Sequence, residues 1–211
     1  LTATPGRGIS EVQNKRLIEK FRENLITLEI FNAEKNELYE GNVVQYLEDE
    51  NILAEAIPQN LNTNFQYDLS EEDWKRLMTL HEGDHPEWSV EFLKSLANDN
   101  VRNTIIVEEL KKLADEGKKI LYFSVDQNQA KLIFVALQKL DVSSAYVDKD
   151  TDKKFRKQII KKFKDTDEIN VICNFNIFST GFDVPDIDVV FIARPINSPV
   201  LFNQIVGRGT R

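Results

Sequence analysis

The last eight residues of the chain carry side chains suited to phosphate chemistry. Gln204 precedes Arg208 and Arg211, and Gly207 and Gly209 flank the first arginine. A guanidinium group donates hydrogen bonds in a planar fork and stabilises the negative charge that spreads over a phosphoryl group during its transfer. A spacing of three residues puts both arginines on one side of a helical turn. This tail therefore predicts a surface that closes on a nucleoside triphosphate.

A second constellation lies upstream, where Ser179, Thr180 and Gly181 form a small-residue stretch that ends close to Asp183. Hydroxyl groups and exposed backbone N–H groups at a strand end can hold nucleic-acid phosphates without any net positive charge, and such contacts position the strand rather than read its sequence. Ser124, at the end of the apolar run ILYFS, is a second candidate for a phosphate contact. A helix cap is an equal alternative for Ser124.

His81, Glu82 and His85 match the HExxH pattern, in which two histidines one helical turn apart bind zinc. Gly83 weakens a helix here, Pro86 favours extended backbone before it, and the chain has no other histidine. We therefore expect no metal site.

Seven basic residues lie between positions 153 and 164. Apolar residues recur among them at helical spacing, which favours a solvated helix face, with a DNA-facing surface as the alternative. The basic residues are Lys153, Lys154, Arg156, Lys157, Lys161, Lys162 and Lys164.

The composition excludes several classes of protein. With 35 acidic and 27 basic side chains the net charge is −8, so any contact with nucleic acid must be local. The one cysteine, Cys173, excludes an internal disulfide, is expected to be buried, and is consistent with a reducing cytoplasm. The sequence has no secretory leader and no apolar run long enough to span a membrane.

From residue 118 onward, short apolar runs alternate with amphipathic stretches. This alternation predicts an α/β fold, in which a mainly parallel sheet is covered by helices on both faces. Ligands of such sheets bind beyond the carboxyl ends of the strands, so the loops after Phe123, Cys173 and Ala193 are candidate sites. The predicted strands are 119–124, 143–147, 169–174 and 188–193, and the predicted helices between them are 126–140 and 152–164.

The region before residue 118 is less regular. Further helices are predicted at about 70–78, 87–97 and 100–116, the last ending at Gly117. A helix over 11–24 leads into a strand over 25–30, and the polar stretch 32–41 is interpreted as a linker. Without its strand neighbours, the segment 1–30 is expected to be poorly ordered or paired with another copy of the chain.

The order of these motifs resembles the second RecA-like motor domain of a superfamily 2 helicase. Residues 1–5 (LTATP) resemble motif III of that family, 121–129 motif IV, 178–185 motif V and 204–211 motif VI. The phrase CNFNIFSTGFDVPDIDVVFIARP is similar to the helicase subunits of type III restriction enzymes and their DEAD/DEAH-like relatives. The resemblance implies three parts: residues 1–35 as the tail of the first motor domain, 36–67 as a linker, and 68–211 as the second motor domain.

The resemblance also implies roles for residues and partners. Arg208 and Arg211 would act as arginine fingers on ATP, with Gln204 ordering the γ-phosphate and water, and Thr2 and Thr4 would couple hydrolysis to strand movement. Gly181 and Gly207 would contact the nucleotide, and Asp183 would either bind the ATP ribose or couple the two domains. Ser124, Ser179 and Thr180 would contact nucleic acid. The expected partners are DNA, with RNA not excluded, the first motor domain, and a modification subunit.

The sequence contains neither a P-loop nor a strand-terminal acidic pair for Mg²⁺, which in this family precede motif III. ATP and Mg²⁺ are therefore expected to be bound mainly by the first domain, and this chain alone is predicted to be inactive. The alternative is a helicase-like module that binds nucleic acid or protein without turnover, and a P-loop before Leu1 distinguishes the two.

Overall fold

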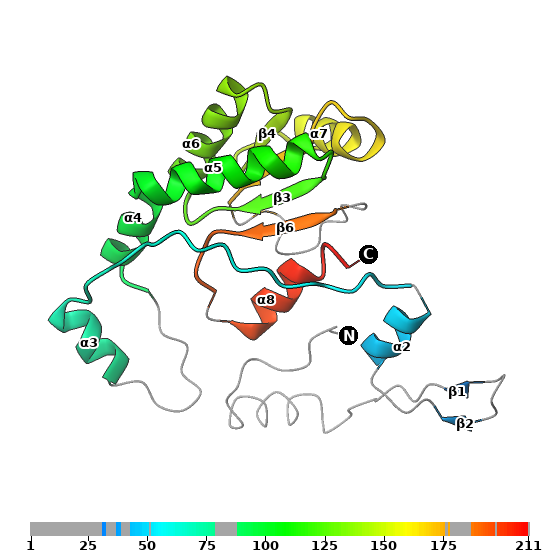
Figure 1. Cartoon of the computed structure of the whole chain (residues 1–211), viewed down its shortest axis with the longest axis horizontal. Coiled ribbons are helices and arrows are strands. Elements are labelled where there is room, and N and C mark those ends of the chain that lie inside the picture. The colour runs from blue at the N-terminus through cyan, green and yellow to red at the C-terminus, as the bar shows by residue number, and fades with distance from the viewer. Residues whose placement is uncertain are drawn as a thin grey trace.

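The computed structural model describes residues 31–32, 37–38, 43–50, 52–78, 88–175, 177, 187–196 and 198–210. Its centre is a parallel four-stranded sheet with the strand order β4-β5-β3-β6 (Figure 1). Phe123 is in register with Asn174 and with Ile192, so three strands end at one edge of the sheet. The strands are β3 (Ile120–Phe123), β4 (Ser144–Val147), β5 (Val171–Asn174) and β6 (Val189–Ile192). All four predicted strands are therefore confirmed.

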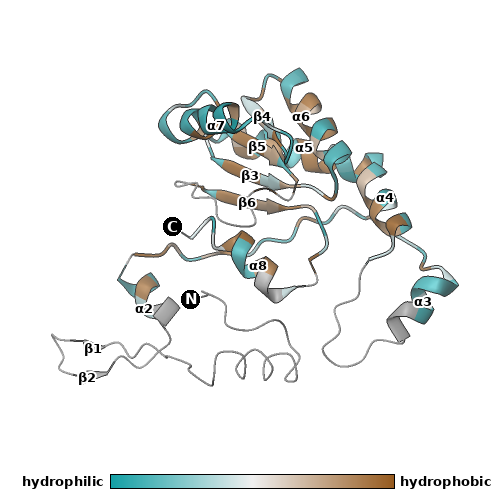
Figure 2. Ribbon diagram, turned by 180° about the vertical axis from the view of Figure 1, so that it is seen from behind, coloured by the Kyte–Doolittle hydropathy of each residue, from teal (hydrophilic) through white to brown (hydrophobic). Residues whose placement is uncertain are grey.

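Helices cover both faces of this sheet. On one face, α5 (Asn100–Asp115) and α6 (Gln127–Lys139) pack through buried aliphatic residues against Ile120 and Tyr122. On the other face, α7 (Lys153–Asp165) and α8 (Pro199–Val206) pack against Leu121 and Phe123. Figure 2 shows the apolar strands between these helices and the polar outer surface of α7. The α/β fold predicted from the alternating pattern is confirmed.

Local sequence signals set the ends of the helices. Asp126 caps α6 by accepting a hydrogen bond from the backbone N–H of Gln129 at 2.7 Å, and Asp152 caps α7 by accepting from Lys154 at 2.8 Å. Gly117 follows α5 with φ +79, a conformation that favours glycine. α4 (Val90–Asn98) is capped by Ser89. The predicted helices over 87–97 and 100–116 are confirmed within a few residues.

The region before α4 differs in part from the sequence prediction. The stretch interpreted as a linker contains part of a two-stranded antiparallel ladder, in which β1 (Phe31–Asn32) pairs with β2 (Glu37–Leu38). A short helix that the sequence did not predict, α2 (Val43–Asp49), follows it. The predicted helix over 70–78 is present as α3 (Glu71–Met78). The predicted elements over 1–30 lie outside the described residues.

Cys173 is fully buried in β5, as predicted, and burial raises the pKa of its thiol. Among the described residues, none of the helices combines the length and the apolar character that crossing a bilayer requires.

Candidate nucleotide and nucleic-acid site

The carboxyl ends of β3, β5 and β6 form one edge, as the register requires, and Ser124 is the first residue beyond β3. Ser124 is fully buried, and its hydroxyl oxygen lies 2.7 Å from the carbonyl of Asp126 and 3.0 Å from the carbonyl of Asn174. The helix cap here is Asp126, so the predicted capping role of Ser124 is wrong. In this geometry the hydroxyl holds two strand ends together, and its predicted phosphate contact stays a prediction.

Asn174 is a buried polar residue at this edge that the sequence did not single out. Its side-chain nitrogen donates to the carbonyl of Tyr122 at 2.8 Å. Among the described residues, none donates a hydrogen bond to its side-chain oxygen. The sequence signal that could have identified Asn174 is its position as a polar residue at the end of the otherwise apolar strand VICN.

Arg194 brings a positive charge to the same edge. Its guanidinium carbon lies 5.6 Å from the ring centroid of Phe175, so the loops that follow β5 and β6 are in contact. Burial lowers the pKa of Arg194 from its ordinary value. The sequence did not single out this arginine because it lies alone in an apolar context.

Gln204 and Arg208 lie at the end of α8, beyond β6. The side chain of Ser198 caps α8 by accepting from the backbone of Leu201 at 3.3 Å, and fully buried Ile205 fixes the helix against the sheet. α8 ends at Val206, so Gln204 is on the helix and Arg208 is on the turn that follows. Arg208 therefore lies on a turn between glycines. Arg211 is outside the described residues, so the predicted placement of both arginines on one side of a helical turn stays a prediction.

Both glycines permit this turn to pack closely. A Cβ atom on Gly207 would lie 2.9 Å from the carbonyl oxygen of Asn203, and one on Gly209 would lie 2.8 Å from a methyl group of Val190 in β6. The backbone N–H of Gly209 donates to the carbonyl of Val206 at 2.9 Å. The turn that carries Arg208 is thus held directly against the edge strand β6.

The segment 52–69 holds the same turn from another direction. The backbone N–H of Ala54 donates to the carbonyl of Thr210 at 3.0 Å. Farther along, Phe65 and Tyr67 make edge-to-face contacts with Phe92 of α4, at centroid distances of 6.3 and 5.0 Å. The segment runs past α8 towards α4 in Figure 1. It therefore connects the arginine turn to the helix layer on the opposite side of the sheet.

Arg102 fixes the end of β6 from within the fold. It is buried on α5, and its guanidinium donates to the carbonyl of Leu96 at 3.2 Å and to the carbonyl of Ala193. Burial lowers the pKa of Arg102, while the negative charge of Asp99 opposes that shift. Because Ala193 directly follows β6, Arg102 determines where the chain leaves the sheet towards α8.

Two amides continue this buried polar network. Asn103 donates to the carbonyl of Ala97 at 2.8 Å, and Gln129 donates to the side-chain oxygen of Asn103 at 2.8 Å. The side-chain oxygen of Gln129 accepts from the backbone N–H of Val125, also at 2.8 Å. The network ties α4, α5 and α6 to the loop after β3, and so makes the carboxyl edge rigid.

Asp148 organises the loop after β4, at the same edge of the sheet. Its carboxylate accepts hydrogen bonds from Tyr146, Gln127 and Thr151 at 2.8 to 2.9 Å. Burial raises the pKa of Asp148, but these hydrogen bonds outweigh that effect and leave the pKa below its ordinary value. Arg156 of α7 donates to the carbonyls of Asp148 and Thr151, which closes the loop.

Several predicted site residues lie outside the described residues. They are Thr2, Thr4, Ser179, Thr180, Gly181, Asp183 and Arg211, together with the His81, Glu82 and His85 pattern. Within the described residues, no group of three metal-binding side chains comes together. Of the predicted residues, the structure places Ser124 at the carboxyl edge, and Gln204, Gly207 and Arg208 at the end of α8.

The fold and the arginine turn define the class of protein. Residues 101–211 match the family described as the helicase conserved C-terminal domain, and the chain belongs to this family. The superfamily 2 helicase resemblance and the RecA-like fold are thereby confirmed.

Several known proteins are similar to this chain. The ATP-dependent helicase IRC3 of Saccharomyces cerevisiae is 35% identical over 121 residues, which are 56% of this chain and 17% of that protein. A 51.5 kDa protein of a Lactococcus phage is 36% identical over 107 residues, which are 50% of this chain and 23% of that protein. A solved fragment of an HsdR subunit of a type I restriction enzyme from Vibrio vulnificus aligns with a TM-score of 0.51 and 28% identity, over 59% of this chain and 26% of that fragment. The chain thus spans about a quarter or less of the length of these proteins.

Proposed function

We propose that this chain is the C-terminal motor half of an ATP-dependent DNA helicase or translocase. The observation that carries the proposal is the arginine-bearing turn, which follows a helix packed on the edge of a RecA-like sheet and is itself packed against β6. Guanidinium groups act on a phosphoryl group only when they are held in position, because their contribution is electrostatic stabilisation by preorganised donors.

In this proposal Arg208 and Arg211 approach the γ-phosphate of ATP from outside the domain that binds it. Gln204, one helical turn before Arg208, orders the γ-phosphate and the attacking water. Gly181, Asp183 and Gly207 contact the nucleotide. ATP and Mg²⁺ are held mainly by a first motor domain that carries a P-loop. Thr2 and Thr4 belong to the segment that couples hydrolysis to strand movement.

Nucleic acid is proposed to lie along the carboxyl edge of the sheet. Ser179 and Thr180 would contact its phosphates through hydroxyl and backbone N–H groups, and Ser124 would support the same edge. The positive charge of Arg194 beside Phe175 supports this placement, because the chain as a whole is acidic. DNA is the proposed substrate, with RNA as the alternative that the test below separates.

The proposed cellular setting is the cytoplasm. A single buried thiol is compatible with the cytoplasm. A restriction role, with a modification subunit as partner, follows from the resemblance to restriction helicase subunits, and the similarity to an HsdR fragment supports it.

The proposal is tested by measuring ATP hydrolysis by the full-length protein alone, with duplex DNA, with single-stranded DNA and with RNA. We expect hydrolysis that rises when DNA is added and that requires Mg²⁺. Binding of DNA without any hydrolysis would instead identify a non-catalytic helicase-like module. A P-loop in the sequence of the full-length protein would distinguish the same two alternatives.

A further inference from the structure

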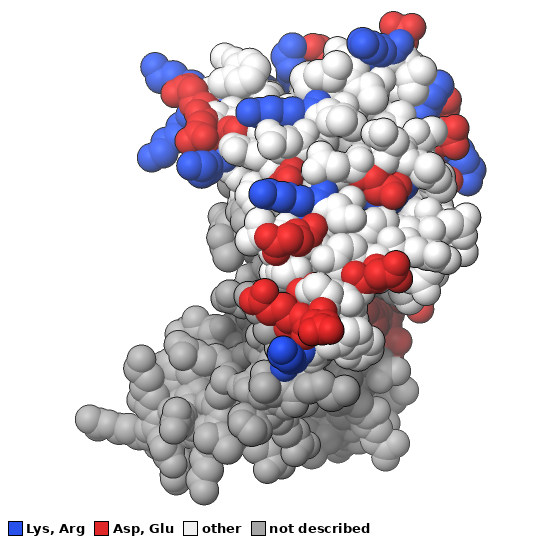
Figure 3. All heavy atoms as spheres, turned by 90° about the vertical axis from the view of Figure 1, so that its left-hand side faces the viewer, with Lys and Arg blue, Asp and Glu red and all other residues white. Residues whose placement is uncertain are grey.

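Helix α7 concentrates positive charge in a chain whose net charge is negative. Its thirteen residues, KKFRKQIIKKFKD, include seven basic side chains and one acidic side chain, whereas the whole chain has a net charge of −8. Figure 3 shows another part of the surface, on which acidic and basic side chains are interspersed. The composition of α7 therefore differs sharply from that of this other part of the surface.

Part of this charge has a structural role within the domain. Arg156 donates to the carbonyls of Asp148 and Thr151 at 3.0 and 3.1 Å. Lys162 forms an ion pair with Glu168 at 2.6 Å. Buried Ile159 and Phe163 anchor the helix on the sheet. These contacts account for two of the seven cations and for the orientation of the helix.

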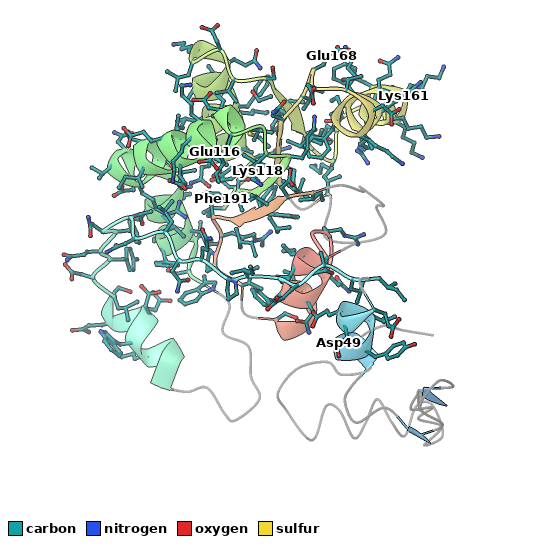
Figure 4. The ribbon with its side chains drawn as sticks, turned by 45° about the vertical axis from the view of Figure 1, so that its right-hand side comes forward. Asp49, Glu116, Lys118, Lys161, Glu168 and Phe191 are labelled. Atoms are coloured by element: carbon teal, nitrogen blue, oxygen red, sulfur yellow. The ribbon has the colours of Figure 1, made fainter. Side chains whose placement is uncertain are left out.

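Four of the remaining lysines form a stripe on the outer side of α7. Lys153, Lys157, Lys161 and Lys164 are exposed, and within the part of the chain that the structure describes none of them has an ion-pair partner. At 100° per residue they fall within about 80° of the helix circumference and span about 16 Å. In Figure 4 the labelled Lys161 of α7 extends away from the sheet. We call these four residues the lysine stripe.

A solvated helix face does not by itself account for this arrangement. Like charges four residues apart destabilise a helix by about 0.2–0.5 kcal/mol per pair, and Lys153, Lys157 and Lys161 make two such pairs. Alternating glutamate and lysine would solvate the face equally well and would add stability. The lysine stripe therefore has an energetic cost that binding of a polyanion would offset.

The stripe begins close to the proposed nucleic-acid edge. α7 follows the Asp148 loop, which lies at the carboxyl end of β4, and runs back towards the start of β5 (Figure 1). Lys153 is therefore at the carboxyl edge of the sheet and Lys164 is towards the opposite edge. A nucleic acid that leaves the carboxyl edge on this side meets the stripe lengthwise.

We propose that the lysine stripe of α7 binds the phosphate backbone of a DNA duplex next to the motor, which extends the proposed helicase function and rests on it. Surfaces for single strands combine cations with aromatic rings on which bases stack. The exposed aromatic residue of α7, Phe155, lies about 160° around the helix from the centre of the stripe, so the stripe offers cations without a stacking surface. This favours a duplex over a single strand.

The proposal is tested in the full-length protein by replacing all four lysines of the stripe with glutamine. Glutamine keeps high helix propensity, so the variant should remain folded and at least as stable as the wild type. The matched control removes the same charge from exposed positions on and around α4, α5 and α6, through Lys94→Gln, Lys112→Gln, Lys118→Gln and Lys139→Gln. Duplex affinity is measured as a function of salt concentration, and thermal unfolding is followed in parallel.

We expect weaker duplex binding by the stripe variant, with a salt slope shallower by about 3 to 4, because each phosphate contact contributes about 0.9 to that slope. The control variant should keep the wild-type slope. The proposal is overturned if the salt slope of the stripe variant is unchanged, or if the control variant loses as much duplex affinity as the stripe variant. Binding to polyglutamate, an acidic polypeptide, is measured as well, and its loss in the stripe variant without any loss of duplex affinity also overturns the proposal. ATP hydrolysis without DNA should be the same in both variants as in the wild type. Absence of any ATP hydrolysis by the wild type, with or without DNA, would refute the motor function separately.

Discussion

The packing of the arginine turn on β6 leads to a quantitative prediction about Gly209. A methyl group at this position would lie 2.8 Å from a Cγ atom of Val190, well inside contact distance. Valine is branched at Cβ and has few rotamers, so the clash is relieved mainly by moving the turn. Overpacking of this kind costs about 1–3 kcal/mol. Gly209→Ala should therefore lower the free energy of unfolding by that amount and displace Arg208 from its position.

A double-mutant cycle isolates this contact. Val190→Ala alone removes two half-buried methyl groups and should cost about 1–2 kcal/mol. It also removes the atom against which the new methyl group clashes. The double variant should therefore be less destabilised than the sum of the two single variants, with a coupling energy of about 1–2 kcal/mol.

The assay is urea unfolding of each variant together with DNA-stimulated ATP turnover of the full-length protein. Gly117→Ala is the control, because Gly117 has φ +79 and no atom lies within 4 Å of the position that its Cβ would take, so the substitution should cost about 1–2 kcal/mol through backbone strain alone. It should not couple to Val190→Ala and should leave ATP turnover unchanged. Additive costs for Gly209→Ala and Val190→Ala would refute the inferred close packing of the arginine turn on β6.

Two further predictions concern the groups that shape the carboxyl edge. Arg102→Met leaves the carbonyls of Leu96 and Ala193 without their buried donor, so the free energy of unfolding should fall by about 2–4 kcal/mol. An unchanged urea midpoint would show that these hydrogen bonds do not stabilise the fold. Hydrogen bonds lower the pKa of Asp148, so its contribution to stability is present above the unfolded pKa of about 3.9 and is lost as the pH falls through the lower folded value. The stability difference between wild type and Asp148→Asn, measured by urea unfolding from pH 6 to pH 3, should therefore shrink on acidification; a constant difference would contradict the hydrogen-bonded carboxylate.

The elements of the second half of the chain could be predicted because their signals are local. Short, continuous buried runs such as ILYF and VICN are typical of strands in a parallel sheet. Asp126 and Asp152 mark the starts of the helices α6 and α7. The ladder of β1 and β2 was not predicted because each strand has only two residues in a polar context.

The contacts that position the site could not be predicted in the same way, because they join distant residues. Arg102 and Ala193 are 91 residues apart in sequence, and neither residue signals the other. The contact between Ala54 and Thr210 uses backbone atoms, which carry no sequence information. Arg208 was identified as a site residue from its motif, but its place on the turn after α8 was not predicted. The close approach of Gly209 to Val190 joins this turn to β6, a contact between two separate elements.

Arg208 is proposed to act on ATP that another domain holds. The decisive measurement uses Arg208→Ala in the full-length protein, with Lys118→Ala as a surface control and with nucleotide affinity measured separately from turnover. We predict that kcat for DNA-stimulated ATP hydrolysis falls by about 10³ to 10⁵, while ATP still binds and Arg208→Lys fails to restore activity, because lysine lacks the planar fork. Wild-type ATP turnover by Arg208→Ala would exclude a role of this arginine in hydrolysis.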